Sequence, residues 1–134
     1  MSQPNDRRGI DKTVADLLDA TAAAAEIVAR GREAWDDDRL LRLAGEAVIS
    51  RIGDAASKLP ASVRASMPSG PWEEIRANRV LVAHIYHRID YEILWETLRR
   101  DVPKLAAELE NWQRSLGHEG EQSTKHDSGQ DIGS

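Results

Sequence analysis

The sequence predicts an all-α protein built as an antiparallel bundle of four to five helices. Apolar residues recur at spacings of three and four along most of the chain, which is the period of a helix with one buried face. The helix formers Ala, Leu, Arg and Glu are abundant, and no segment is a convincing strand. The 134 residues suffice for one domain around one hydrophobic core.

Residues that favour helix ends bound the first two predicted helices. The first begins at Asp11 and ends near Gly31, because glycine is common just after a helix. The acidic residues 36–38 then suit the positive N-terminus of a second helix, which ends at Pro60. Its apolar stripe comprises Leu40, Leu41, Ala44, Ala47, Val48, Ile52, Ala55, Ala56 and Leu59.

A short helical turn is expected over residues 61–67, before the helix-breaking cluster Pro-Ser-Gly-Pro at 68–71. Pro71 suits the first position of a third helix, which carries two glutamates in its first turn and extends towards Ile89. Asp90 is placed to cap a fourth helix, in which Pro103 predicts a kink or a short break.

These elements divide the chain into three parts. Residues 1–10 are expected to be a flexible N-terminus, residues 11–116 the bundle, and residues 117–134 a disordered polar tail with too little apolar surface to offset its ordering entropy. The tail holds four acids and one Lys, so it contributes −3 to the net charge of −5.

Composition excludes several classes of function. The chain has no Cys, so thiolate metal sites, disulfides and cysteine nucleophiles are ruled out. No stretch approaches the length of a membrane span, and no apolar run follows the N-terminal charges, so we expect a cytoplasmic protein without membrane partners. The acidic balance argues against a general nucleic-acid coat but leaves room for a local basic site.

The third predicted helix has two apolar faces. The core-facing stripe consists of Ile75, Val82, Ile85 and Ile89, and the opposite face is mostly uncharged, with Ala77, Val80, His84, Tyr91 and the nearby His87. A second protomer covering that face is a natural explanation. On an ideal helix His84 lies roughly 140° around from Arg79, so a joint site requires an irregular helix or groups from two protomers.

Residues 71–105, PWEEIRANRVLVAHIYHRIDYEILWETLRRDVPKL, resemble the signature region of the HepT-like toxins, a branch of the HEPN superfamily. The matching motif residues are Trp72, Ile75, Arg79, His84 and Tyr86. The Ile-Gly-Asp-Ala run at residues 52–55, together with Trp95 and Pro103, extends the resemblance, which covers about residues 13–116.

The resemblance implies a HEPN-like homodimer acting as the toxin of a type VII-like toxin–antitoxin pair, a metal-independent endoribonuclease that needs no cofactor of its own. It assigns catalysis to Arg79 and His84. An imidazole can move protons near neutral pH, and a guanidinium can stabilise the negative charge that develops on an attacked phosphate. The implied partner is a minimal, MntA-like nucleotidyltransferase antitoxin, which uses ATP to adenylylate Tyr86.

One departure from the family pattern opens an alternative. The family usually has a polar residue directly after the motif Arg, where this chain has Val80, and Asn78 stands on the preceding side instead. A catalytically silent dimeric module, serving as substrate of a nucleotidyltransferase, is therefore the second hypothesis. A metal-dependent hydrolase using His84, His87 and Asp90 is the third, although His87 alone is better explained as a supporting or interface residue.

The basic and aromatic residues also allow two interpretations each. Positive side chains on the third and fourth helices can guide RNA phosphates or form ion pairs with neighbouring acids: Arg76, Arg88, Arg99, Arg100 and Lys104. The tryptophans can stack on bases, yet in a chain without Phe we expect them to supply core bulk: Trp35, Trp72, Trp95 and Trp112.

Overall fold

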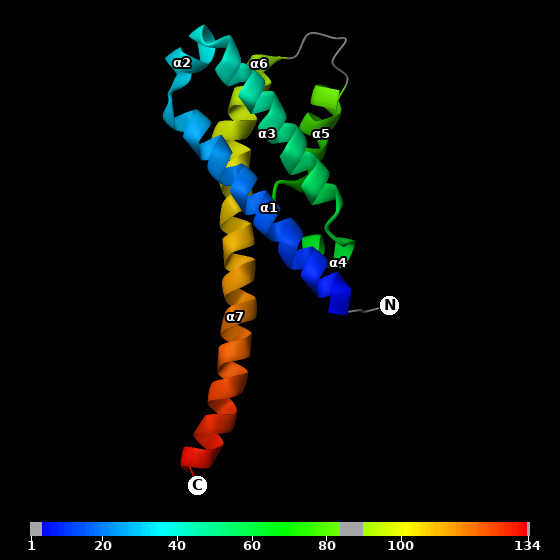
Figure 1. Ribbon diagram of the computed structural model, residues 1–134, viewed down its shortest axis with the longest axis vertical. Helices are drawn as coiled ribbons and strands as arrows, with labels where there is room; N and C mark the ends of the chain where they lie inside the picture. Colours follow the sequence, from blue (N-terminus) through cyan, green and yellow to red (C-terminus); the bar gives the residue numbers. More distant parts are fainter. Residues whose placement is uncertain (1–3, 84–89, 134) are drawn as a thin grey trace.

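The computed structural model describes the backbone of residues 4–83 and 90–133 and the side chains of residues 7–78 and 90–117. Within these ranges the chain is helical and contains no strand, as predicted. The helices alternate in direction, and the bundle tapers into one long helix that carries the C-terminus (Figure 1). The elements are α1 (Pro4–Ala29), α2 (Arg32–Asp37), α3 (Arg39–Ser57), α4 (Ala61–Ala65), α5 (Trp72–Ala83), α6 (Tyr91–Glu96), the π-helical turn η1 (Thr97–Asp101) and α7 (Val102–Gly133).

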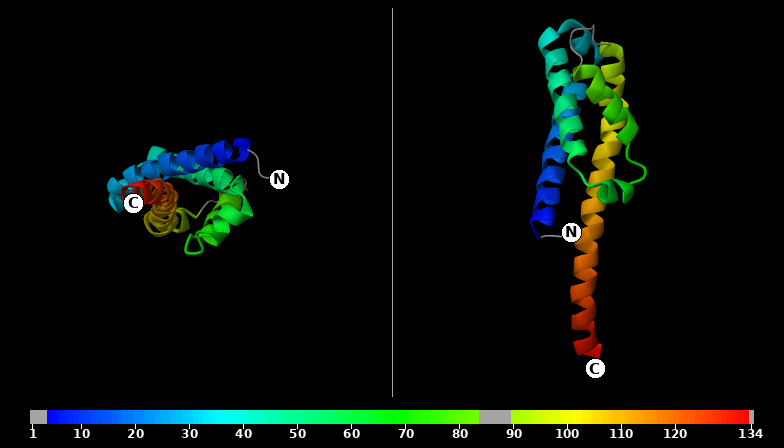
Figure 2. Two further views of the ribbon diagram at one scale, coloured as in Figure 1. Left: turned by 90° about the horizontal axis from the view of Figure 1, so that it is seen from below. Right: turned by 90° about the vertical axis from the view of Figure 1, so that its right-hand side faces the viewer.

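The helices pack in pairs around one core. α3 lies between α1 and α5, and the continuous rod of α6, η1 and α7 packs across α1 and α5 (Figure 2). The largest fully buried side chains come from six elements and include Leu17, Trp35, Ile52, Leu98 and Leu105. No described helix combines the length and apolar character that crossing a membrane requires.

Several helix ends agree with the sequence. Gly31 follows α1 with φ of 92°, a left-handed conformation that glycine adopts without strain. The Asp38 and Asp90 carboxylates cap α3 and α6 by accepting hydrogen bonds from backbone amides. The expected short turn after Pro60 is present as α4, and two glutamates occupy the first turn of α5.

Other predictions were wrong in detail. α1 begins at Pro4 rather than Asp11, and the chain between Gly31 and Asp38 forms α2, a helix too short for periodicity to reveal. The stripe expected on α3 is core-facing only towards its C-terminal end: Leu40 is 72 % exposed, and Ala44 and Ala47 are exposed as well.

Pro103 neither breaks nor sharply bends the last helix. Proline lacks the N–H that would bond to the Arg99 carbonyl, and its ring collides with that carbonyl in a regular α-helix. The chain widens instead into η1, whose residues end directly before α7. This local widening accommodates the proline while the rod continues.

α7 continues beyond the predicted tail boundary, with helical backbone to Gly133, and extends past the rest of the bundle (Figure 1). Extending an existing helix avoids the cost of forming a new nucleus, because each residue that is fixed adds one backbone hydrogen bond. The mobility expected of residues 117–134 stays a prediction.

A substitution at Gly45 tests the packing of Trp35 against α3. A Cβ at this position would lie 2.6 Å from Cη2 and 2.7 Å from Cζ3 of the buried Trp35 ring. We expect Gly45→Ala to lower the free energy of unfolding by about 1–3 kcal/mol, measured by chemical denaturation. Gly9→Ala is the matched control, because no described atom lies within 4 Å of the added methyl group. It should be neutral or stabilise by up to about 1 kcal/mol. Equal effects of the two substitutions would contradict this packing.

Candidate active site

The motif predicted from the sequence begins on α5. The backbone of this helix carries Arg79 and Val80, whose side chains lie outside the described residues. His84, Tyr86 and His87 also lie outside them. The structure therefore positions the helix that leads into the motif and the helix that follows it, α6, and the geometry between the motif side chains stays a prediction.

Asn78 is the motif neighbour that the structure places in full. Its side chain is 6 % exposed, and Nδ2 donates to the Glu74 carbonyl at 2.9 Å. Its Oδ1 is buried and accepts no hydrogen bond from any described group. Leaving such an acceptor unpaired costs about 1–3 kcal/mol. Asn78, one residue before Arg79, is therefore buried with one acceptor unpaired among the described groups.

The start of α5 is fixed by contacts with the preceding turn. Trp72 Nε1 donates to the Met67 carbonyl at 3.0 Å, and the Ile75 amide donates to the carbonyl of the buried Pro71 at 3.0 Å. Ile75 is 3 % exposed and belongs to the core, as its place on the predicted stripe requires. The helix therefore enters the motif from a fixed N-terminal end.

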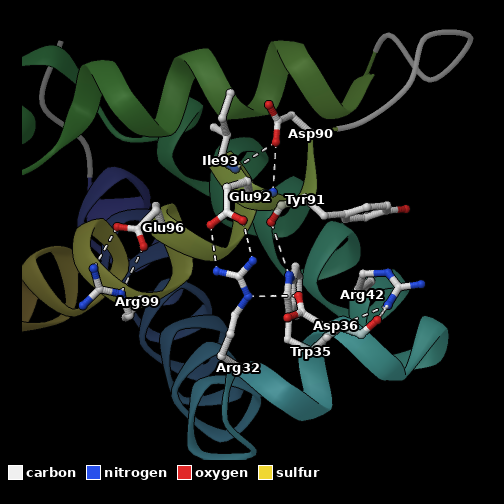
Figure 3. Close-up of polar contacts among 10 residues, drawn as sticks. All are labelled: Arg32, Trp35, Asp36, Arg42, Asp90, Tyr91, Glu92, Ile93, Glu96 and Arg99. Atoms are coloured by element: carbon white, nitrogen blue, oxygen red, sulfur yellow. Dashed lines mark hydrogen bonds and ion pairs between the residues drawn. The ribbon is translucent and has the colours of Figure 1, made fainter.

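The chain after the motif is fixed by the cap of α6. Asp90 Oδ1 accepts from the Glu92 amide at 3.0 Å and from the Ile93 amide at 3.3 Å (Figure 3). This carboxylate was one of the three groups in the metal hypothesis, and one of its oxygens serves as a helix cap. Among the described residues no cluster of His, Asp and Glu is arranged to hold a metal ion.

Tyr91 ties the same end of the motif to α3. Its hydroxyl donates to Glu46 Oε2 at 2.5 Å, and the Arg42 guanidinium lies 5.3 Å from the centroid of its ring. The Tyr91 carbonyl accepts from Trp35 Nε1 at 3.2 Å. The sequence grouped Tyr91 with the partner-facing surface of the third helix, but this residue begins α6 and contacts its own bundle.

The hydrogen bond from Tyr91 to Glu46, with some help from burial, raises the pKa of the Tyr91 hydroxyl above 10. The protonated hydroxyl is the donor, so it is the form that the fold stabilises. This contribution is complete below pH 10 and is lost as the pH rises through the raised pKa.

An ion pair adds a second tie, to α2. The Arg32 guanidinium contacts both carboxylate oxygens of Glu92, one of them at 2.7 Å, and also donates to Asp36 at 2.9 Å (Figure 3). All three side chains are substantially exposed, so each contact contributes modestly to stability. The bidentate geometry nevertheless fixes the direction in which α6 leaves the motif.

The basic residues proposed to guide RNA are largely engaged with acids. Arg76 pairs with Glu73 at 3.0 Å, and Arg99 and Arg100 pair with Glu96 at 2.8 and 3.8 Å. The hydrogen bond from Arg99 lowers the pKa of Glu96. These surfaces fit the ion-paired alternative, while Arg88 lies outside the described residues.

Sequence reasoning missed Arg32, Arg42 and Glu46, which brace the end of the motif. Arg32 and Glu92 are 60 residues apart, and Tyr91 and Glu46 are 45 apart. A single sequence carries no signal for pairs at such separations, because periodicity reports only on neighbours along one helix.

The Tyr91 contact yields a pH-dependent prediction. We expect Tyr91→Phe to lower the free energy of unfolding by about 1 kcal/mol at neutral pH, since the lost bond is charge-assisted but only half-buried. The difference from the unsubstituted protein should shrink above pH 10. Glu46→Gln keeps an acceptor without the charge and should show an intermediate pH dependence. A Tyr91→Phe difference that stays constant through pH 11 would contradict the assignment.

Comparison with known proteins places these observations in a family. The family model described as "Ribonuclease HepT-like" matches residues 17–112, which include α5, the motif and α6. "Probable ribonuclease HepT" of Thermococcus cleftensis is 28% identical over 104 residues, covering 74% of this chain and 94% of the relative. "Putative RNase MJ1380" of Methanocaldococcus jannaschii is 32% identical over 74 residues, covering 55% of this chain and 68% of the relative.

No solved structure gives a significant match. The family match spans well over half of the sequence and agrees with the helical architecture. The chain belongs to the ribonuclease HepT-like family.

Proposed function

We propose that the protein is a metal-independent endoribonuclease and the toxin of a two-protein system. The family match over residues 17–112 carries the proposal, and this range includes Arg79, His84 and Tyr86, which the sequence resemblance assigns to the site. Relatives named as ribonucleases, such as the T. cleftensis protein, support RNA as the substrate.

The proposed reaction uses groups of the chain alone. His84 takes the proton of an RNA 2′-hydroxyl, whose oxygen attacks the adjacent phosphorus. The bond to the 5′-oxygen breaks as the protonated His84 delivers that proton to the leaving oxygen. Arg79 stabilises the extra negative charge on the phosphoryl oxygens as the attack proceeds. The products are a 2′,3′-cyclic phosphate and a free 5′-hydroxyl.

A homodimer would supply the geometry that one straight helix lacks. His84 lies roughly 140° around from Arg79 on ideal helical geometry, so Arg79 of one protomer facing His84 of its partner would form a composite cleft. The uncharged face at positions 77, 80 and 84 suits a surface that meets a second copy. Asn78, through its hydrogen bond to the Glu74 carbonyl, would stabilise the turn of α5 that precedes Arg79.

A nucleotidyltransferase antitoxin would silence this site. Transfer of AMP from ATP to the Tyr86 hydroxyl, with release of pyrophosphate, places a phosphodiester two residues from His84. Its bulk and negative charge would exclude the RNA backbone. Val80 favours the second candidate function, a catalytically silent dimer that is modified in the same way, because it removes the usual polar group beside Arg79.

Cleavage of single-stranded RNA tests the nuclease. We expect cleavage that persists in EDTA, falls at least about 100-fold in Arg79→Ala and disappears in His84→Ala, read from cyclic-phosphate ends on a sequencing gel. His118→Ala, a histidine beyond the bundle, is the matched control and should cleave normally. Retained cleavage in His84→Ala would refute the proposed chemistry.

Modification by the partner is tested separately. Incubation with ATP and a nucleotidyltransferase encoded beside the gene should add AMP to Tyr86, detected by peptide mass spectrometry. The chain has two tyrosines, and the Tyr91 hydroxyl is engaged by Glu46, so Tyr91→Phe should still be modified whereas Tyr86→Phe should not. Modification without any RNA cleavage would select the silent dimer, and modification at Tyr91 would contradict the assignment.

A further inference from the structure

A cavity of about 480 Å³ lies beside the start of α5 and is separate from the contacts that brace α6. α3, α4 and α5 enclose it, at the end of the bundle opposite α2 (Figure 1). Its volume falls within the range of sites that hold small molecules or cofactors. Apolar groups form much of its wall, including Gly53, Ala56 and Ile75.

The cavity carries an aromatic ring held in one orientation. Trp72 lines it, and its indole N–H is committed to the Met67 carbonyl at 3.0 Å. Gly70 lies directly against the ring, where an added Cβ would be 2.7 Å from Cε2 and Nε1. The ring is only partly buried although it packs against the core. A fixed and accessible indole is a preorganised surface for stacking a planar group.

The cavity also carries a cation that has no carboxylate partner among the side chains that the structure describes. Arg76 and Glu73 pair with each other at its rim, at 3.0 Å. Arg64 is half-buried in the last turn of α4 and forms no ion pair with any described residue. The lining therefore has a net positive charge in a chain whose overall charge is −5. A half-buried guanidinium without a counter-charge favours an anionic ligand.

The cavity lies next to the motif on the same helix. Arg76 is at its rim, and position 79 is three residues further on, on the same side of α5 and about 4.5 Å along the axis. A chain molecule held in the cavity can therefore continue towards the proposed catalytic residues.

From these features we propose that the cavity is a substrate subsite, which holds one nucleotide of single-stranded RNA next to the cleaved bond. Its base stacks on Trp72, and a flanking phosphate pairs with Arg64. This deepens the proposed ribonuclease function and rests on it. An apolar helix of a protein partner would match the apolar wall but would bring no negative charge to Arg64. A nucleotide supplies both a planar base and a phosphate.

Binding of an RNA that cannot be cleaved tests the subsite apart from catalysis. The probe is a fluorescein-labelled oligoribonucleotide with 2′-O-methyl groups throughout, and anisotropy reports its affinity. Arg64→Ala should weaken binding at least about fivefold and reduce the dependence of log K on log salt by about 0.7, the value for one phosphate contact on a single strand. Ala65→Leu places bulk at the cavity from an exposed position and should weaken binding without changing the salt dependence.

Arg30→Ala is the matched control, because this exposed arginine follows α1 at the other end of the bundle. It should bind like the unsubstituted protein, and circular dichroism should show all three variants folded. Unchanged RNA affinity in both Arg64→Ala and Ala65→Leu would overturn the subsite, even where His84-dependent cleavage is intact. Arg64-dependent binding without cleavage would support the subsite and refute the nuclease instead.

Two further outcomes distinguish other occupants. If AMP binds in an Arg64-dependent manner while the oligonucleotide does not, the cavity belongs to a free nucleotide and the RNA subsite is overturned. The same holds if Arg64→Ala abolishes binding of the nucleotidyltransferase and leaves RNA affinity unchanged, because the cavity would then be a protein interface.

Discussion

The packing of Trp35 is the constraint on which the positions around the motif depend. Its ring is 1 % exposed, lies 5.4 Å from the Trp95 ring and fills the space left by Gly45 on α3. Its indole N–H reaches the Tyr91 carbonyl at the first residue of α6. One side chain on a six-residue helix thus joins α2, α3 and α6. Because a closely packed core does not tolerate gradual displacement, the start of α6 has one position relative to α3.

The position of α6 matters for chemistry because α6 is the first described helix after the motif. Arg79 is carried by α5, whose N-terminal end is held by Trp72 and Pro71, and Asp90 caps α6 after the motif. A group that transfers protons must be held to within a fraction of an ångström, so fixed elements on both sides of the proposed catalytic residues would serve their chemistry. The exposed ion pair of Arg32 and Glu92 contributes more to the orientation of α6 than to the stability of the fold.

Sequence reasoning succeeded where the physical cause is local. Helical periodicity gave the fold class, the acidic residues 36–38 and Asp90 gave two helix starts, and Gly31 gave a helix end, since each effect acts within about one turn. Sequence reasoning failed at α2 because a helix of six residues has no measurable period. It also failed at Leu40, because an apolar stripe does not show how much of a helix is covered by neighbouring helices. The cavity beside Arg64 was also missed, because three successive helices line it and their sequence does not show how they fold against one another.

The distribution of paired and unpaired cations reconciles an acidic chain with an RNA substrate. Net charge governs long-range attraction, whereas binding at one site depends on the few cations whose charge is not already neutralised. Arg76, Arg99 and Arg100 are matched with glutamates, so they add little to the field that an incoming phosphate meets. Arg64 retains its charge beside an apolar wall, where water screens it less than at an exposed surface. Under the proposed function, a chain with a charge of −5 binds a single RNA strand at the cavity beside Arg64, although its net charge disfavours nucleic acid elsewhere.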